Sequence, residues 1–145
     1  SVERARQRTQ EWLTQRGLRF PELVIDNGSG LSRSERISAG SMNQLLLDAW
    51  QHPAMPELIS SLPLVGIDGT MKKRLNGSLA SGRAHIKTGT LDGVKTAAGY
   101  ALDARGNRHA VTFFINHAQA QAGNAAIDAM LTWIAQRQDN APCCR

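Results

Sequence analysis

Two runs of alternating apolar and polar residues dominate the C-terminal third of the chain. The first run covers residues 94–102, and the second, within RHAVTFFINH, places Val111, Phe113 and Ile115 on one face. A period of two is typical of strands, and the short turn sequence DARGN between the runs joins antiparallel neighbours. A third strand candidate, Ala84–Thr90, precedes them across the dipeptide DG. The sequence therefore predicts an antiparallel meander of two to three strands.

A helix is predicted to follow this meander, from Gln119 to Gln138. Its apolar stripe comprises Ile127, Met130, Leu131 and Ile134, which recur at helical spacing. The preceding run, 94–102, is rich in alanine and glycine, and small residues let a helix approach a strand closely. We therefore expect this C-terminal helix to cover one face of the sheet.

The N-terminal half is predicted to be mainly helical. Helices are expected over Val2–Arg16, from an N-cap at Ser38 to Trp50, and over Met55–Ser61. A short extended run, Leu23–Ile25, precedes the turn cluster DNGSG, and residues 63–83 have no clear period and predict loop. Together with the meander this indicates an α+β fold, with helices packed on a small antiparallel sheet.

Composition limits the class of protein. The chain has 145 residues, 41% of them hydrophobic and 20% charged, as expected for a single globular domain over 1–145. No apolar run is long enough to predict a transmembrane segment, and the charged start SVERARQRTQEW predicts no signal peptide. The adjacent Cys143 and Cys144 suit neither an ordinary disulfide nor a metal site, and residues 139–145 are expected to form a flexible tail.

Several kinds of site are not supported by the sequence. The histidines, His52, His85, His109 and His117, lack the spacing of metal ligands, so neither a metal nor another cofactor is expected. The stretch GSGLSR matches neither nucleotide-binding fingerprint. A net charge of +5 favours acidic partners only weakly, and without a recognisable motif no nucleic acid is expected.

One tripeptide within the first strand candidate is suited to chemistry. Lys87, Thr88 and Gly89, followed by Thr90, combine a cation, two hydroxyls and a glycine. On a rigid strand such groups form a preorganised anion site. K-T-G is also the third box of serine acyl-transferases of the penicillin-binding and β-lactamase type.

Two further stretches make the resemblance specific. The sequence DNGSGLSR, 26–33, precedes a helix, and PLVGIDGT, 63–70, precedes KTGTLDGV. In this order they resemble the C-terminal part of D-alanyl-D-alanine carboxypeptidases/endopeptidases, the low-molecular-mass penicillin-binding proteins. That family carries D-G-S-G-L-S-R, which has one asparagine fewer than this chain. The resemblance implies a penicillin-binding or β-lactamase-like fold. It also implies that the loop residues are structural or lie near the site: Asp26, Gly28, Ser29, Gly30, Ser32 and Arg33.

The resemblance also implies roles for the strand residues. Lys87 would supply positive charge beside the substrate's terminal carboxylate, and the hydroxyls of Thr88 and Thr90 would hydrogen-bond that carboxylate. The Thr90 backbone N–H would be an oxyanion-hole donor. Gly89, which has no Cβ, would let a peptide lie along the strand.

The other two boxes of the family are not recognised. No serine has a lysine three residues later, so the S-x-x-K nucleophile box is missing. Ser41-Met42-Asn43 matches S-x-N, but it follows the loop rather than preceding it and is better interpreted as helix residues. We therefore expect the C-terminal part of a longer enzyme, inactive alone, which needs the N-terminal part of its parent protein.

The expected partners follow from the resemblance. They are peptidoglycan peptides ending in D-Ala-D-Ala and, in the complete enzyme, β-lactams, both met in the periplasm. An exposed sheet edge also predicts a homodimer. The alternative is a non-catalytic peptidoglycan-binding or scaffold module that keeps the fold without the chemistry.

Overall fold

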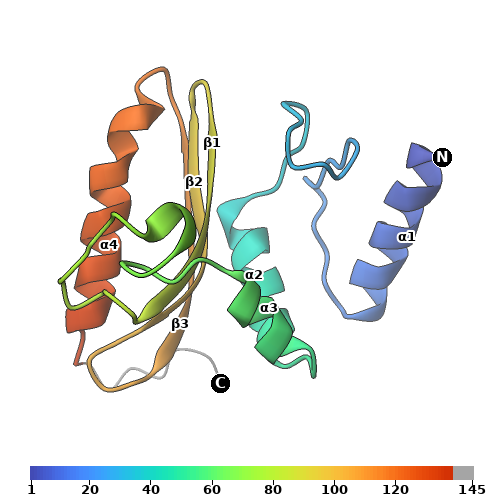
Figure 1. Cartoon of the computed structure of the whole chain (residues 1–145). Helices are drawn as coiled ribbons and strands as arrows, with labels where there is room; N and C mark the ends of the chain where they lie inside the picture. Colours follow the sequence, from blue (N-terminus) through green and yellow to red (C-terminus); the bar gives the residue numbers. More distant parts are fainter. Residues whose placement is uncertain (139–145) are drawn as a thin grey trace.

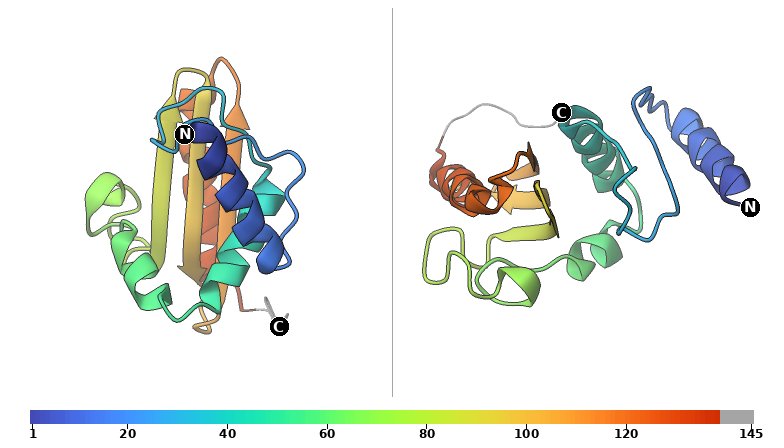
Figure 2. Two further views of the ribbon diagram at one scale, coloured as in Figure 1. Left: turned by 90° about the vertical axis from the view of Figure 1, so that its right-hand side faces the viewer. Right: turned by 90° about the horizontal axis from the view of Figure 1, so that it is seen from above.

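The computed structural model describes residues 1–138, so the predicted tail at 139–145 lies outside the described residues. Its elements are α1 (Val2–Gln15), α2 (Ala39–Trp50), α3 (Met55–Ser61), η1 (Gly69–Met71), β1 (Ala84–Leu91), β2 (Val94–Leu102), β3 (Arg108–Asn116), η2 (Ala120–Gly123) and α4 (Asn124–Gln136). They form layers, with α4 on one face of the sheet, α2 on the other, and α1 beyond α2 (Figure 1, Figure 2). The predicted α+β class is confirmed.

The sheet is an antiparallel meander in the order β1-β2-β3, as predicted. The two-residue turn at Asp92 and Gly93 sets the register of the first hairpin, which pairs Leu91 with Val94 and Thr90 with Lys95. Gly93 has φ 72°, a conformation that costs glycine little. Among residues 1–138, no helix has the length and apolar character needed to cross a membrane.

The main core lies between the sheet and α4. It comprises Val65, Met71, Ala80, Ala84, Ile86, Ala97, Ala101, Val111, Ile127, Leu131, Ile134 and Ala135. Burying each large aliphatic side chain contributes about 1.5–3 kcal/mol. Ala97 and Ala101 of β2 belong to this core and face α4, which confirms the predicted close approach of the C-terminal helix to this strand.

Gly99 of β2 has a different neighbour from the one expected. A Cβ at this position would collide with the backbone carbonyl oxygen of His85, and the φ of Gly99 is 153°. The close approach at Gly99 is therefore to the neighbouring strand β1, not to the helix. The strand-pairing geometry, rather than helix packing, requires glycine here.

The helix boundaries agree with the predicted ones to within one residue except at α4, which ends at Gln136 and not at the predicted Gln138. Ser38 caps α2 through a hydrogen bond from the Ser41 N–H to its Oγ (3.0 Å). The prediction that the last helix begins at Gln119 was wrong: residues 120–123 form the 3₁₀ turn η2, and α4 starts at Asn124. Ala120 is buried, and Gly123 packs so closely on Ile115 that a Cβ would collide with it. This docking on β3 turns the chain before the α-helix begins.

The extended run Leu23–Ile25 forms only a single bridge. Val24 and Arg36 exchange two backbone hydrogen bonds (2.9 and 3.0 Å). This bridge closes the base of the loop that contains DNGSGLSR. The loop therefore starts and ends at one fixed point between α1 and α2.

Candidate functional site

The outer edge of β1 is paired only at its beginning. The Val65 N–H donates to the Ala84 carbonyl (2.9 Å), and the Ile86 N–H donates to the Pro63 carbonyl (2.8 Å). β1 is the first strand of the sheet order, so no strand of residues 1–138 covers the rest of this edge. The edge is therefore open over the K-T-G segment.

Strand geometry decides which backbone groups face this opening. Along a strand, backbone groups point alternately to one neighbour and the other. Because the Ile86 N–H points outward, the N–H and C=O groups of Thr88 and Thr90 point outward too. The Lys87 ammonium folds back onto this edge and donates to the Thr88 carbonyl (2.5 Å). A cation and two outward N–H groups thus lie together at the open edge.

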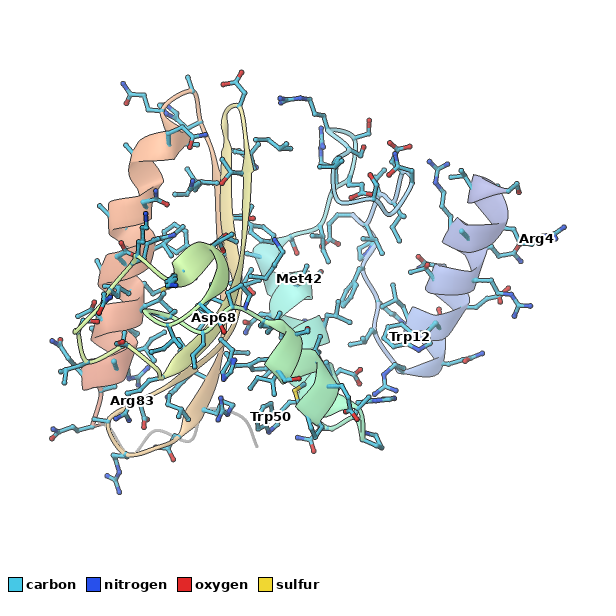
Figure 3. All side chains as sticks on the ribbon, in the orientation of Figure 1. Arg4, Trp12, Met42, Trp50, Asp68 and Arg83 are labelled. Atoms are coloured by element: carbon cyan, nitrogen blue, oxygen red, sulfur yellow. The ribbon has the colours of Figure 1, made fainter. Side chains whose placement is uncertain are left out.

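A groove of about 740 Å³ lies beside this edge, between the sheet and the DNGSGLSR loop. It is lined by Gly30, Ser32, Arg33, Glu35, Arg36, Ile37, Met42, Lys87, Thr88, Gly89, Leu91, Val94, Thr96, Ala98, Phe114 and Asn116. Met42, labelled in Figure 3, belongs to α2, the helix that lies on the face of the sheet opposite α4. The structure therefore brings the two predicted stretches, the loop and the K-T-G strand, to opposite walls of one groove.

The groove is electropositive. Its lining contains three cationic residues, Lys87, Arg33 and Arg36, against one acidic residue, Glu35. Glu35 Oε1 already accepts the Gly28 N–H (3.1 Å). The lining has cations at the walls and apolar side chains from α2 and β3, which suits an anionic ligand with an apolar body.

The loop wall is held in shape largely by its own polar groups. The Ser29 N–H donates to Asn27 Oδ1 (2.9 Å), and the Ser34 N–H donates to Ser32 Oγ (3.0 Å). Such Asx- and ST-turns fix a loop without secondary structure. The Arg33 guanidinium donates to the Asp92 carbonyl (3.3 Å) and so ties the loop to the β1–β2 turn.

Not every loop residue named from the sequence reaches the groove. Gly30, Ser32 and Arg33 line it, whereas Asp26 and Ser29 do not. Asp26 forms a salt bridge with Arg6 of α1 (3.8 Å). Gly28 instead lines a separate apolar cavity of about 360 Å³ between α1 and α2. The first half of the loop therefore contacts α1 and the cavity beside it, whereas the second half lines the groove.

The two threonine hydroxyls each contact a residue that the sequence patterns did not identify. Thr88 Oγ1 lies 2.9 Å from Thr70 Oγ1, in η1. Thr90 Oγ1 accepts a hydrogen bond from the Lys95 ammonium (2.9 Å). Thr90 itself does not line the groove, and strand alternation places its side chain, like that of Thr88, on the α4 side of the sheet. The hairpin register could have revealed Lys95; nothing in the sequence pairs Thr70 with Thr88.

The formal S-x-N match, Ser41-Met42-Asn43, lies within α2. Its Asn43 Oδ1 accepts a hydrogen bond from Thr112 of β3 (3.4 Å), so the asparagine connects the helix to the sheet. Tyr100 adds a second connection by donating to the Leu46 carbonyl (2.6 Å), and its burial raises the pKa of the phenol to about 12. These contacts fix α2 as one support of the groove.

The described part of the chain offers no cluster of three or more His, Cys, Asp or Glu residues that could hold a metal ion. The groove's own chemistry consists of cations, hydroxyls and outward N–H groups. These groups bind and polarise an anion or a carbonyl oxygen.

Comparison with known proteins relates the chain to a family. Residues 1–137 match the D-Ala-D-Ala carboxypeptidase 3 (S13) family. The chain is 34% identical over 108 residues to the D-alanyl-D-alanine carboxypeptidase DacB of Haemophilus influenzae, a match that covers 72% of this chain and 22% of that protein. It is 35% identical over 96 residues to the D-alanyl-D-alanine carboxypeptidase of Actinomadura sp. (strain R39), a match that covers 63% of this chain and 18% of that protein.

A solved structure is similar over nearly the whole chain. The crystal structure of penicillin binding protein 4 (dacB) from H. influenzae, complexed with a novel β-lactam, matches with a TM-score of 0.66 and 27% identity. The match covers 92% of this chain and 27% of that one. The chain therefore spans about a quarter or less of the length of the relatives that it matches.

Proposed function

The chain belongs to the D-Ala-D-Ala carboxypeptidase 3 (S13) family, and from this premise we propose that it supplies the substrate-carboxylate and oxyanion wall of a serine D-alanyl-D-alanine carboxypeptidase/endopeptidase. The substrate would be a peptidoglycan peptide ending in D-Ala-D-Ala, met in the periplasm. The reaction would proceed through an acyl-enzyme, which β-lactams would also form in the complete enzyme.

One observation carries this proposal: the K-T-G edge of β1 is open beside an electropositive groove. A peptide can add to an open edge as an extra strand, because its backbone pairs with the free N–H and C=O groups. Its terminal carboxylate would then lie near the Lys87 ammonium. The outward N–H of Thr90 would donate to the scissile carbonyl oxygen, and losing such a donor typically costs about 10²–10³ in kcat.

Gly89 keeps the groove open in this arrangement. A Cβ at Gly89 would collide with Thr96 Oγ1 on the neighbouring strand. The two residues face each other in the register and both line the groove. Glycine therefore leaves room for the Thr96 hydroxyl, as well as for a ligand above the strand.

The nucleophile would come from outside this chain. No serine here has a lysine three residues later. The formal S-x-N match lies within α2, where Asn43 Oδ1 accepts a hydrogen bond from Thr112 of β3. We infer that the chain alone is inactive and that the N-terminal part of its parent protein completes the cleft. A homodimer through an exposed sheet edge is a further expectation of the same kind.

The experiment that tests the proposal is a pair of NMR titrations of the ¹⁵N-labelled chain with N-acetyl-D-Ala-D-Ala and with its L,L isomer. The D,D peptide is expected to shift the amides of 87–91 and of the groove, and the L,L peptide to shift them much less. Lys87→Met should weaken the D,D response, whereas Lys73→Met, at an exposed lysine elsewhere, should not. Equal responses to both isomers would contradict the proposal.

A second measurement tests the absence of chemistry. Intact mass after incubation with benzylpenicillin is expected to show no adduct. A covalent penicilloyl adduct on this chain would show that it carries its own nucleophile. The alternative function, a non-catalytic peptidoglycan-binding module, would be favoured if the complete parent protein also binds the D,D peptide without cleaving it or being acylated.

A further inference from the structure

Lys95 of β2 lies across the first hairpin from Thr90, on the α4 side of the sheet. Its ammonium donates to Thr90 Oγ1 (2.9 Å) and to Gln121 Oε1 of η2 (3.4 Å). The Gln121 amide nitrogen donates in turn to the Leu91 carbonyl (3.2 Å). Within residues 1–138, Lys95 forms no salt bridge with a carboxylate. Its charge is therefore free to act on the K-T-G strand.

The direction of the first hydrogen bond is fixed by chemistry. An ammonium has three protons and no lone pair, so it can only donate. The Thr90 oxygen must therefore accept, and its single hydroxyl proton remains available for a different acceptor. The Gln121 carboxamide is also oriented, with its oxygen toward Lys95 and its nitrogen toward the backbone of β1.

We propose that Lys95 is a positioning residue for the substrate carboxylate: it holds the Thr90 hydroxyl as a donor and adds a second positive charge behind the K-T-G strand. The inference rests on the proposed function, because the acceptor is the terminal carboxylate of the peptide. The carboxylate would lie at the open edge of β1, where Lys87 would reach it from the groove face and the Thr90 hydroxyl, held by Lys95, from the α4 face. The pair selects ligands with a free, charged C-terminus over amidated ones.

The first test needs no ligand. Three-bond couplings from Cγ2 of Thr90 to its backbone nitrogen and carbonyl carbon report whether the side chain keeps one χ1 rotamer. The Thr90 side chain is expected to keep one rotamer in the unmodified chain. In Lys95→Met the couplings should be averaged over several rotamers. In Lys95→Arg, which keeps a cationic donor, they should again indicate a single rotamer. The control Lys73→Met should leave Thr90 unchanged. Averaging already present in the unmodified chain, or none in Lys95→Met, would overturn the inference.

The second test measures binding of N-acetyl-D-Ala-D-Ala and of its C-terminal amide, from the Thr90 amide shift. Lys95→Met is expected to weaken binding of the acid roughly tenfold, to leave the amide nearly unaffected, and to keep the dispersed spectrum of β2 and β3. Lys95→Arg should recover most of the loss. Unchanged acid binding in Lys95→Met would refute the role of Lys95 alone. An unmodified chain that does not prefer the acid would refute the proposed function, while the couplings would still decide whether Lys95 positions Thr90.

Discussion

Thr70 and Thr88 join their hydroxyl oxygens at 2.9 Å, across eighteen positions of the sequence. This hydrogen bond connects the PLVGIDGT segment to the K-T-G strand. The same segment also pairs with the start of β1 through Pro63 and Val65. The segment therefore supports β1 at two places. Its backbone pairs with Ala84 and Ile86, and the Thr70 hydroxyl contacts Thr88.

Thr70→Val removes this hydroxyl but keeps the shape of the side chain. We expect a loss of about 0.5–1 kcal/mol in the free energy of unfolding, the usual value for one hydrogen bond, together with amide shift changes centred on 87–89. Urea denaturation and an NMR spectrum measure both. Thr14→Val is the control, since Thr14 bonds only within α1. If the amide shifts around Thr88 are unchanged in Thr70→Val, the Thr70 hydroxyl does not support the K-T-G strand.

Gly89→Ala places a methyl group against Thr96 Oγ1. We expect a destabilisation of about 1–3 kcal/mol, as for other overpacked sites, and loss of peptide binding in the groove. The double variant Gly89→Ala/Thr96→Ala removes the collision and should recover stability. Denaturation midpoints of the two single variants and the double variant form the cycle. Strict additivity of the two single effects would show that the residues do not interact.

Gly99→Ala is expected to be the most damaging glycine substitution in the sheet. The added Cβ would meet the backbone oxygen of His85, which cannot move without breaking the β1–β2 ladder. A loss above about 4 kcal/mol follows, in the exceptional range for a single change. Thermal unfolding by circular dichroism measures it. Gly40→Ala in the first turn of α2, where a Cβ would make only an ordinary van der Waals contact with Ser38 Oγ (3.9 Å), should instead be neutral or slightly stabilising.

Asp103 is the hub of the β2–β3 turn. Its carboxylate, 2% exposed, accepts hydrogen bonds from His109 Nε2 (3.0 Å), the Asn107 N–H (2.8 Å) and the Arg105 N–H (2.9 Å). Burial alone would raise the pKa of the carboxyl, but these hydrogen bonds, with one from the Asn107 side chain, lower the pKa overall. The carboxylate form is therefore favoured by folding.

Asp103→Asn should lower the free energy of unfolding by about 3 kcal/mol at pH 7, because buried donors lose their charged acceptor. A lowered folded-state pKa stabilises the fold above the unfolded-state pKa of about 3.9 and is lost as the pH falls through the folded value. The difference between the two proteins should thus shrink below pH 4. Urea titrations at several pH values measure it, with Asp92→Asn, in the other hairpin turn, as control. Equal losses of stability in the two variants would contradict the role of the Asp103 carboxylate in holding the β2–β3 turn.

Glu22 acts at the beginning of α2. Its Oε1 accepts the Ser38 N–H (3.0 Å), and hydrogen bonds from the side chains of Ser38 and Ser41 lower the pKa of Glu22 to about 2. The stabilisation is present above the unfolded pKa of about 4.3 and is lost as the pH falls through about 2. Glu22→Gln should therefore be less stable than the unmodified chain at pH 7 and equally stable once the pH is below about 2. A difference independent of pH would show that the charge is not involved.

Most of the secondary structure could be predicted because local patterns and packing agree in this chain. β2 has the predicted bounds 94–102, the alternating residues Val111, Phe113 and Ile115 lie in β3, and α3 has its predicted bounds. The start of α4 could not be predicted, since the contact of Gly123 with Ile115 depends on tertiary docking. The reason why position 99 requires glycine could not be predicted either, because the contact is with the backbone of another strand.

The candidate site was predictable to a similar degree. The motifs identified the two walls, the loop and the K-T-G strand, because each motif is a local sequence. The division of the loop was not visible, since the contact of Asp26 with Arg6 needs the position of α1. Thr70 was missed as a partner of Thr88 for the same reason. Lys95 was accessible in principle, because a two-residue turn pairs it with Thr90.

The two long edges of the sheet differ in how much chain they can accept. The edge of β1 is occupied at Ala84 and Ile86 and open only beyond them, whereas β3 has no backbone partner on its outer side within residues 1–138. A strand of full length can therefore be added only at β3, while β1 accommodates a segment of a few residues. The length of the free edge would therefore favour stable addition of a full strand at β3 and binding of short peptides at β1. Addition of a strand to complete the sheet would then leave the peptide site at β1 open.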